Sequence, residues 1–411
     1  MFSRFLRYCE RTYDLMQELA SVHDIRVKPQ LSTLSVVVGL FFMVSVRVGS
    51  LNGIEQALRR CPGRSVWHEW LGGELPSADR LGEVAALLDM DQLRAVLLGH
   101  YHQRRRKKTL WRFGRRWSVL VLDGHEQCAS YLRGCERCSK RTVRVDGKET
   151  IQRYHRYVLA YLLGEKDGLL LDLEMQGPGE AEITAARRLV RRLLGACPRA
   201  FDVVAGDALY LDPTLCKEVL AAGKHFIVVL KNEDRDLLVD FRQLQKLVPS
   251  VRLGYKDRVC TCQDIEGLTT WPQVGRAVRV VSSDEERTVV HQRSRRAETK
   301  QSTWVWATSL SSTEMTTERL VELGHRRWDI ENRGFNELVT TWHVDHVYHH
   351  DVQAMTAILL LTFFAYNLFH VWHSRDLKPE LRKDHSVVHF SRQISAEFYY
   401  KLRITTGLSP P

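Results

Sequence analysis

The sequence lacks the marks of a secreted protein. It begins MFSRFLRYCERTYDL, where charged residues recur before any apolar run is long enough for a signal peptide. Its nine cysteines are an odd number scattered through a large chain, which argues against a disulfide framework. We therefore expect a protein of the reducing cytoplasm.

The sequence also lacks a clear membrane span. Residues 31–46 are uncharged but contain several polar residues, and they fall short of the roughly 20 apolar residues that a bilayer requires. Residues 354–372 are about long enough, yet Thr356, Thr362 and Asn367 interrupt them. We expect both stretches to be core helices, the second covering one face of a sheet, and we expect no membrane partner.

Positive charge is in excess. The 411 residues carry a formal net charge of +11, and the isoelectric point is near 9.2. Such a chain is long enough for two or three domains with proper cores. The charge favours a polyanionic partner, although basicity alone would also suit a membrane-binding or simply soluble protein.

The most basic segment is YHQRRRKKTLWRFGRRW, residues 101–117, in which aromatic residues alternate with basic ones. It is either a solvated linker or a phosphate-binding segment supported by aromatic stacking. The second interpretation predicts DNA contacts from five consecutive residues: Arg104, Arg105, Arg106, Lys107 and Lys108.

Two aspartates follow apolar runs that are typical of buried strands. Val119 to Leu122 run without interruption into Asp123, and a second run, FDVVAG, leads to Asp207. A carboxylate at the end of a strand lies on the rim of a sheet, where open α/β folds place their chemistry. Either aspartate alone is also compatible with a turn or a helix cap.

A glutamate lies on the apolar face of a predicted helix. Residues 316–342 read as one helix in which Glu331 shares a stripe with Phe335 and Trp342. Burying a lone carboxylate there is unfavourable unless a cation or a hydrogen-bonding partner offsets the cost. A metal ion shared with the two aspartates would do so, and pairing with Arg327 one turn earlier is the alternative.

The order of these segments resembles that of the bacterial insertion-sequence DDE transposases, which have a ribonuclease-H-like catalytic core. Between the two aspartates the sequence predicts strands at about residues 154–163 and 168–173 and a helix at about residues 180–194. A short helix and the strand HFIVVLK follow Asp207, and the helix with the glutamate comes later. The resemblance covers roughly residues 117–375.

The string Arg327-Trp328-Asp329-Ile330-Glu331 matches part of a signature, Tyr-x2-Arg-x3-Glu-x6-Lys, found in one subgroup of that family. The tyrosine position is Gly324 and the lysine position is Leu338. In the family these side chains contact the phosphates of the transposon end, so the resemblance does not explain how this chain holds that end.

The resemblance implies an enzyme with a defined set of partners. Asp123, Asp207 and Glu331 would bind two Mg²⁺ ions, for which Mn²⁺ can substitute, and Arg327 would orient the glutamate or contact a phosphate. The implied reactions are cleavage at insertion-sequence ends and joining of those ends to target DNA, by a homodimer on paired ends associated with the bacterial nucleoid. Two other classes stay open: a catalytically inactive DNA-binding protein derived from a transposase, and a nuclease that does not join strands.

Composition shifts and the resemblance together predict an α/β chain of six segments. They are a helical N-terminal domain that binds DNA ends at 1–103, a basic linker at 104–116, the first part of the ribonuclease-H-like core at 117–231, a β-rich insertion at 232–303, the second part of the core with the glutamate helix at 304–375, and a C-terminal tail at 376–411.

Cysteine spacing raises a second metal question. Cys135-x2-Cys138, with Cys128 before it and His155 after it, offers soft ligands for structural zinc, and the pair Cys260-x-Cys262 offers others. Free cysteines in a reducing cell are the alternative. The histidines beyond the predicted helix are not assigned as ligands: His343, His346, His349 and His350.

Overall fold

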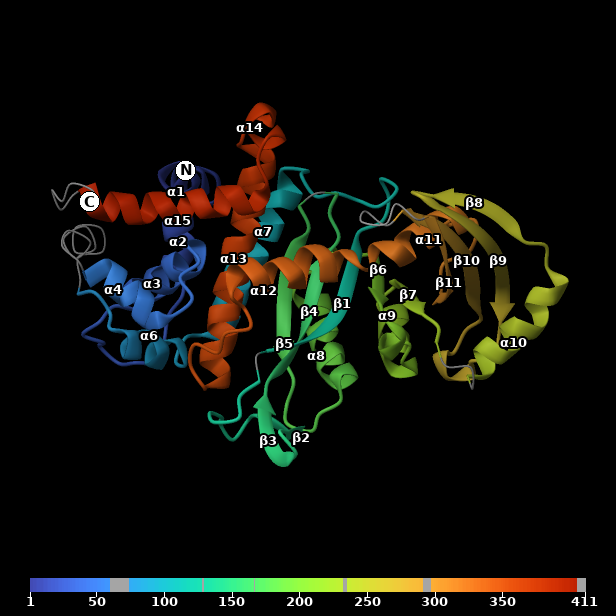
Figure 1. Cartoon of the computed structure of the whole chain (residues 1–411), viewed down its shortest axis with the longest axis horizontal. Helices are drawn as coiled ribbons and strands as arrows, with labels where there is room; N and C mark the ends of the chain where they lie inside the picture. Colours follow the sequence, from blue (N-terminus) through green and yellow to red (C-terminus); the bar gives the residue numbers. More distant parts are fainter. Residues whose placement is uncertain (60–73, 128, 166, 232–234, 291–296, 405–411) are drawn as a thin grey trace. The chain divides into compact units, whose positions relative to one another are not determined.

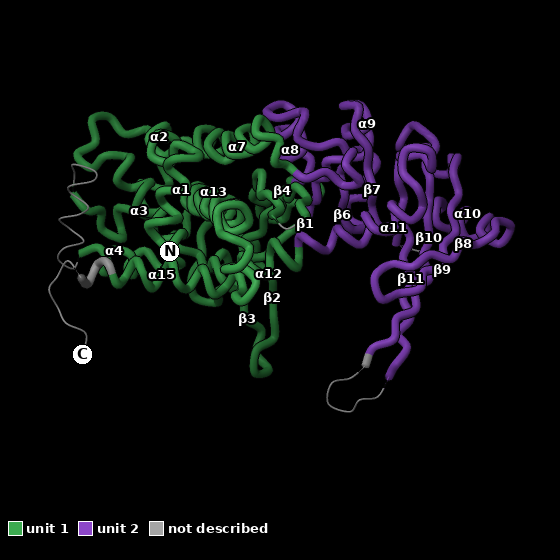
Figure 2. Tube along the Cα trace, turned by 90° about the horizontal axis from the view of Figure 1, so that it is seen from above, with its two compact units in different colours: residues 1–110, 124–185, 331–411 green, residues 111–123, 186–330 purple. Residues whose placement is uncertain are grey.

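The computed structural model describes residues 1–59, 74–127, 129–165, 167–231, 235–290 and 297–404. The chain divides into two compact units, shown in Figure 2. Unit 1 comprises residues 1–110, 124–185 and 331–411, and unit 2 comprises residues 111–123 and 186–330. Two of the points at which the chain passes between units lie beside predicted catalytic carboxylates, directly after Asp123 and directly before Glu331.

Unit 1 consists mainly of helices around one long apolar helix, α13. Its helices are α1 (Phe2–Tyr13), α2 (Leu15–Ala20), α3 (Thr33–Ser45), α4 (Leu51–Arg59), α6 (Ala78–Ala85), α7 (Met90–Arg106), α12 (Asn336–Trp342), α13 (Val352–Arg375), α14 (Pro379–Lys383) and α15 (Val387–Ile404). Helix α13 is capped by Asp351, whose side chain accepts hydrogen bonds from the N–H groups of Gln353 and Ala354. It packs against α3, α7 and strand β5 (Leu169–Met175), as Figure 1 shows. Residues 1–103 therefore share a unit with the C-terminal part of the chain.

By length and composition, helix α13 is long and apolar enough to cross a membrane. Its apolar stretch is, however, entirely buried inside the protein. Its polar residues find partners there. The Thr362 hydroxyl donates to the carbonyl of Ile358 at 2.7 Å, and the Asn367 amide exchanges hydrogen bonds with the backbone N–H and C=O of Leu170 on β5. The prediction that residues 354–372 form a core helix is confirmed.

Unit 1 also contains two antiparallel strand pairs. One is β4 (Arg156–Leu162) with β5, and the other is a separate hairpin of β2 (Ser139–Val145) and β3 (Lys148–Tyr154). The hairpin turns at Asp146 and Gly147, whose φ angles of 49° and 80° suit the two-residue turn that Asp-Gly favours. It projects from unit 1 in Figure 2, and most of its side chains are exposed. This hairpin was not predicted from the sequence, although Asp-Gly between two polar strands is a signal for it.

Unit 2 is built on a sheet with the strand order β1, β6, β7, β11, β10, β9, β8. The bounds are β1 (Val119–Glu126, continuing into unit 1 after Asp123), β6 (Val203–Gly206), β7 (His225–Val229), β8 (Val251–Tyr255), β9 (Arg258–Leu268), β10 (Val278–Val290) and β11 (Ala297–Thr308). Strands β1, β6 and β7 are parallel, and helix α9 (Pro213–Ala221) makes the crossover from β6 to β7 that parallel neighbours require. From β11 onward, neighbouring strands are antiparallel. The remaining helices are α8 (Glu182–Ala196, beginning in unit 1), α10 (Asp236–Leu244) and α11 (Thr317–Arg326).

The fold is thus mixed α/β, and one predicted boundary falls inside a strand. Strand β11 runs continuously across residues 303 and 304, pairing with β10 along its length and with β7 at its end. Residues 297–303 are exposed and residues 305–308 are buried. The apolar pattern therefore begins in the middle of β11, which is why the sequence suggested a boundary there. The six-segment division stays a prediction.

The basic segment is not one continuous linker. Residues 104–106 form the last turn of α7, and the side chains of residues 105–108 are exposed. Phe113 and Trp117 are buried in unit 2. The guanidinium carbon of Arg326 lies over the ring of Trp111, 4.4 Å from its centroid. These aromatic rings are engaged in packing, so the expected support from aromatic stacking on DNA does not hold for them.

Arg104 is a correction to the predicted set of DNA contacts. Its side chain is 2% exposed, and its Nη2 lies 2.7 Å from Oδ2 of Asp167, which is also buried. A second hydrogen bond joins Nη2 to the carbonyl of Thr109 at 3.3 Å. Because the guanidinium neutralises a buried carboxylate, Arg104 belongs to the core of unit 1 and is not available to a phosphate.

Replacing Arg104 with alanine should lower the free energy of unfolding by about 3 kcal/mol, since it leaves Asp167 buried without its closest partner. The measurement is the midpoint and slope of urea unfolding of the full chain. Arg106→Ala, at an exposed position two residues later, is the matched control and should change stability by less than about 0.5 kcal/mol. Equal stability of the two variants would contradict the buried ion pair.

Candidate active site

Two predicted catalytic carboxylates lie near the carboxyl ends of adjacent parallel strands in unit 2. Asp207 directly follows β6, as predicted, whereas Asp123 lies within β1, which runs on to Glu126, so the prediction that this strand ends at Asp123 is wrong. Strands β1 and β6 pair with Val119 opposite Val203 and Val121 opposite Ala205. Continuing this register by two residues brings Asp123 level with Asp207 on the same face of the sheet. Neighbouring strands lie about 4.8 Å apart, so this register makes the two half-buried residues neighbours on that face.

Asp207 also has a local structural role. Its Oδ1 accepts a hydrogen bond from the N–H of Leu209 at 2.9 Å and caps the short 3-10 helix η1 (Ala208–Tyr210). The residue before Asp207 must be glycine, because a Cβ on Gly206 would lie 2.7 Å from Cγ of the buried Tyr210. A carboxylate has several lone pairs, so capping leaves Asp207 able to bind a cation as well.

Arg327 is a buried cation beside Asp123. Its side chain is 6% exposed, and its Nη1 lies 3.7 Å from Oδ2 of Asp123. The same guanidinium lies over the ring of Trp328, 4.7 Å from the centroid. At 3.7 Å the pair interacts through charge and not through a hydrogen bond. The sequence suggested that Arg327 orients Glu331 or contacts a phosphate; the contact seen within unit 2 is with Asp123.

The predicted helix at residues 316–342 has the expected ends but is not continuous. Thr316 caps α11 by accepting a hydrogen bond from the N–H of Arg319, and α12 ends at Trp342. Between them lies a π-helical turn, η4 (Ile330–Phe335), in which Glu331 is the second residue. Such turns insert a residue into a helix and are frequent at functional sites. Glu331 is half-buried and begins the last segment of unit 1.

Within unit 1, the turn η4 is held by a histidine that the sequence did not single out. The ring of His125 stacks on Phe335, the last residue of η4, with centroids 4.7 Å apart. The Nε2 of His125 also lies 2.7 Å from Oδ1 of Asp345. His125 is two residues after Asp123 on β1, and the string Asp-Gly-His was its only sequence signal.

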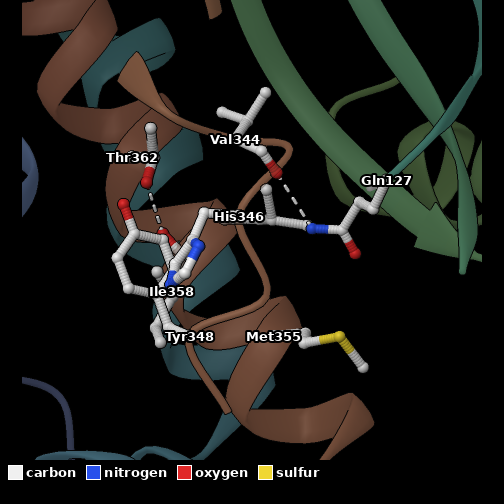
Figure 3. Close-up of a pocket in the computed structure, with 8 residues that line it drawn as sticks. Gln127, Val344, His346, Tyr348, Met355, Ile358 and Thr362 are labelled. Carbon is white, nitrogen blue, oxygen red and sulfur yellow. Dashed lines mark hydrogen bonds between the residues drawn. The ribbon is translucent and has the colours of Figure 1, made fainter. Parts of the chain in front are cut away.

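A hydrogen bond joins the segment after α12 to Gln127, the residue that follows β1. Gln127 Nε2 donates to the carbonyl of Val344 at 3.0 Å, as the close-up in Figure 3 shows. These residues line a narrow pocket with His346, Tyr348 and Met355. Burial lowers the pKa of His346, so this imidazole is neutral near pH 7.

A further carboxylate lies beside Gly124, the residue that follows Asp123 on β1. A Cβ added to Gly124 would lie 2.2 Å from Oε2 of Glu182, the first residue of α8. Gly124 therefore leaves room for that carboxylate. Glu182 was not predicted as a site residue, because nothing in the sequence around it marks it.

The two departures from the signature have structural reasons. A Cβ on Gly324 would lie 2.4 Å from Cε2 of Trp306, whose ring stacks on Trp304. Leu338 is fully buried in unit 1. Neither position can present a tyrosine or a lysine to DNA without displacing core residues.

Residues 132–368 match a family model described as the transposase DDE domain. No curated protein matches the chain. Because the matched residues are more than half of the 411, the chain belongs to the family of transposases with a DDE domain. Membership makes it an enzyme of DNA transposition. The matched range includes Asp207, Arg327 and Glu331, and it begins after Asp123.

Restoring the signature tyrosine should damage the protein. Gly324→Tyr should lower the free energy of unfolding by about 2–4 kcal/mol, because the new side chain overlaps Trp306. Gly195→Tyr is the matched control, since Gly195 also lies in a helix but a Cβ there meets nothing within 4 Å.

The double variant Gly324→Tyr/Trp306→Ala should cost less than the sum of its two single changes, as measured by denaturant unfolding. If the losses in the free energy of unfolding are additive, or if Gly324→Tyr is as stable as Gly195→Tyr, Trp306 does not fill the space beside residue 324.

Proposed function

We propose that this transposase cuts insertion-sequence ends and joins them to target DNA by metal-assisted phosphoryl transfer, as a homodimer on paired ends, with a ribonuclease-H-like core. The observation that carries the proposal is the parallel register of β1 and β6, which sets Asp123 opposite Asp207 when it is continued by two residues. Each acid alone has a structural explanation. Two carboxylates side by side on one face of a sheet offer oxygen ligands that a divalent cation can share.

The residues fit Mg²⁺ by their chemistry. Carboxylate oxygens are hard ligands, and Mg²⁺ commonly takes one or two of them and fills its other positions with water or phosphate oxygens. The hydrogen bond from Leu209 orients the Asp207 carboxylate, as supporting contacts of metal ligands do. We assign Asp123, Asp207 and Glu331 as the ligands. When bound, two metal ions would activate the attacking water or 3′-hydroxyl and stabilise the leaving oxygen.

Arg327 positions Asp123 in this proposal. Its buried guanidinium lies beside Asp123 and over the ring of Trp328, so it holds a fixed place next to the carboxylate. Arg327→Lys should therefore be a poor substitute, since a lysine lacks the planar group that lies over Trp328.

The third ligand is proposed from unit 1. Glu331 lies in the π-helical turn that His125 and Asp345 hold in place through Phe335. His125 follows Asp123 on the same strand, and Phe335 follows Glu331 by one helical turn. We propose that this packing sets the position of Glu331.

A second candidate function is that of a transposase-derived protein without the full reaction. Gly324 and Leu338 favour it, because neither position carries the signature residue that contacts the transposon end. Such a protein would bind DNA without reacting, or would cut without joining. A supercoiled plasmid that carries the element's ends, incubated with the protein and Mg²⁺, separates the three functions. Joined products support the proposal; binding without nicking, or cutting without joining, supports an alternative.

Removing the charge of any ligand should abolish the chemistry. Asp123→Asn, Asp207→Asn and Glu331→Gln should each reduce end cleavage and strand joining by at least about 1,000-fold, because the three act as one unit. Double variants should be scarcely worse than single ones. Binding to end DNA, measured by gel shift in Ca²⁺, should persist.

Asp212→Asn is the matched control for the aspartates. Asp212 caps α9 by accepting from the N–H of Leu215 at 2.8 Å, and asparagine caps a helix equally well, so activity should stay near that of the wild type. A variant of Asp123, Asp207 or Glu331 that cleaves at a rate close to wild type would remove that residue from the proposed site.

DNA contacts are proposed for the exposed basic residues at the end of α7. Replacing Arg105, Arg106, Lys107 and Lys108 with alanine in the full chain should make the affinity for DNA less dependent on salt, reducing the log–log slope by about 3. Lys107 contributes least to this figure, because it also donates to the carbonyl of Thr12.

The control is Arg80→Ala, which removes an exposed cation that pairs with Glu83 on α6. Its salt slope should match that of the wild type. An unchanged slope in the fourfold variant would show that residues 105–108 are a solvated helix end.

A further inference from the structure

Three soft ligand atoms converge in unit 1, outside the proposed catalytic site. The Sγ atoms of Cys135 and Cys138 are 3.7 Å apart, and Nε2 of His155 lies 3.5 Å from the first and 3.1 Å from the second. Tetrahedral zinc with Zn–S bonds of about 2.3 Å and Zn–N bonds of about 2.0 Å requires S–S separations of about 3.8 Å and S–N separations of about 3.5 Å. The three side chains therefore already have nearly the spacing that one zinc ion would impose.

The backbone around the cysteines suits thiolates. The N–H of Cys135 donates to Sγ of Cys138 at 3.2 Å, and the N–H of Cys138 donates to the carbonyl of Cys135 at 3.2 Å, which closes a tight turn. The turn directs both sulfurs to one side, toward His155. Hydrogen bonds to a ligand atom orient it for metal binding. At 3.7 Å the sulfurs are far from the bond length of about 2.05 Å that a disulfide would have.

The cluster lies at the base of the β2–β3 hairpin. Ser139 opposite Tyr154 is the last pair of that hairpin, and Cys138 and His155 are the next residues on its two strands. The N–H of Gln127 donates to the carbonyl of His155 at 2.9 Å, which ties the base of the hairpin to the end of β1. An exposed two-stranded hairpin is marginally stable in water, so a metal across its base would have a clear structural effect.

We propose that Cys135, Cys138 and His155 form a structural zinc site that stabilises the base of the β2–β3 hairpin. Two thiolates and an imidazole select zinc over Mg²⁺, so this site is chemically separate from the carboxylate site. The three residues supply three of the four tetrahedral positions. Cys128, which the sequence also suggested, lies outside the described residues, and Cys260 and Cys262 lie on β9 in unit 2.

The test is the metal content of the full chain, purified under reducing conditions, loaded with Zn²⁺ and then dialysed against metal-free buffer. Elemental analysis should find about one zinc per chain. Cys135→Ser/Cys138→Ser should lose it, whereas the control Cys260→Ser/Cys262→Ser should retain it. Cobalt in place of zinc should give a sulfur-to-cobalt charge-transfer band that the first variant lacks. Folded wild-type protein without zinc, or zinc retained by the first variant, would overturn the proposal.

A second measurement covers the case in which the cysteine variant does not fold. Chelation of the wild type should raise the rate of tryptic cleavage at Arg144 and Lys148, beside the hairpin turn, by about tenfold, and added zinc should reverse the effect. A cleavage rate that chelation leaves unchanged would show that no metal stabilises the hairpin. Neither measurement depends on transposase activity, so this proposal and the proposed function can fail separately.

Discussion

The parallel pairing of β1 with β6 is the interaction on which the proposed chemistry depends. Strand β1 is buried and apolar up to Leu122 and β6 is buried up to Gly206, and their register, continued by two residues, makes Asp123 and Asp207 neighbours. A shift of one residue would turn one carboxylate to the opposite face of the sheet. Gly206, which admits the ring of Tyr210, allows the chain to leave β6 closely packed, and Gly124, within β1, leaves room for Glu182. The backbone thus positions the two acids before any ligand binds.

Much of this arrangement could be predicted from the sequence, because apolar runs that stop at an acid are a local signal. The ends of the helical region at residues 316–342 were also predictable from Thr316 and the apolar period. Its interruption by a π-helical turn was not, since no residue type marks such a turn. The burial of Arg104 was equally hidden. In the sequence Arg104 is one of five consecutive cations, and only the fold brings it to Asp167.

The two departures from the signature also have causes that only the fold reveals. Trp306 fills the space beside Gly324, and Leu338 completes the core of unit 1, so neither position is free to bind DNA. The cations predicted to contact DNA, apart from Arg104, lie in two different environments. Arg327 is buried beside an acid of the proposed site, whereas Arg105 and its neighbours at the end of α7 are exposed to solvent. The family assignment rests on residues 132–368, and the role of Asp123 rests on its strand register with Asp207.

The most direct test of the proposed three-carboxylate site is a map of the backbone cuts made by Fe²⁺ in place of Mg²⁺. With ascorbate and peroxide, iron bound by the carboxylates produces hydroxyl radicals that cut the chain close to the metal. We expect cuts near residues 123, 207 and 331 together, all suppressed by excess Mg²⁺, with weaker cuts after any one ligand is replaced. Cuts near the two aspartates that never include the η4 turn, or cuts that Mg²⁺ does not suppress, would contradict a single site formed by Asp123, Asp207 and Glu331.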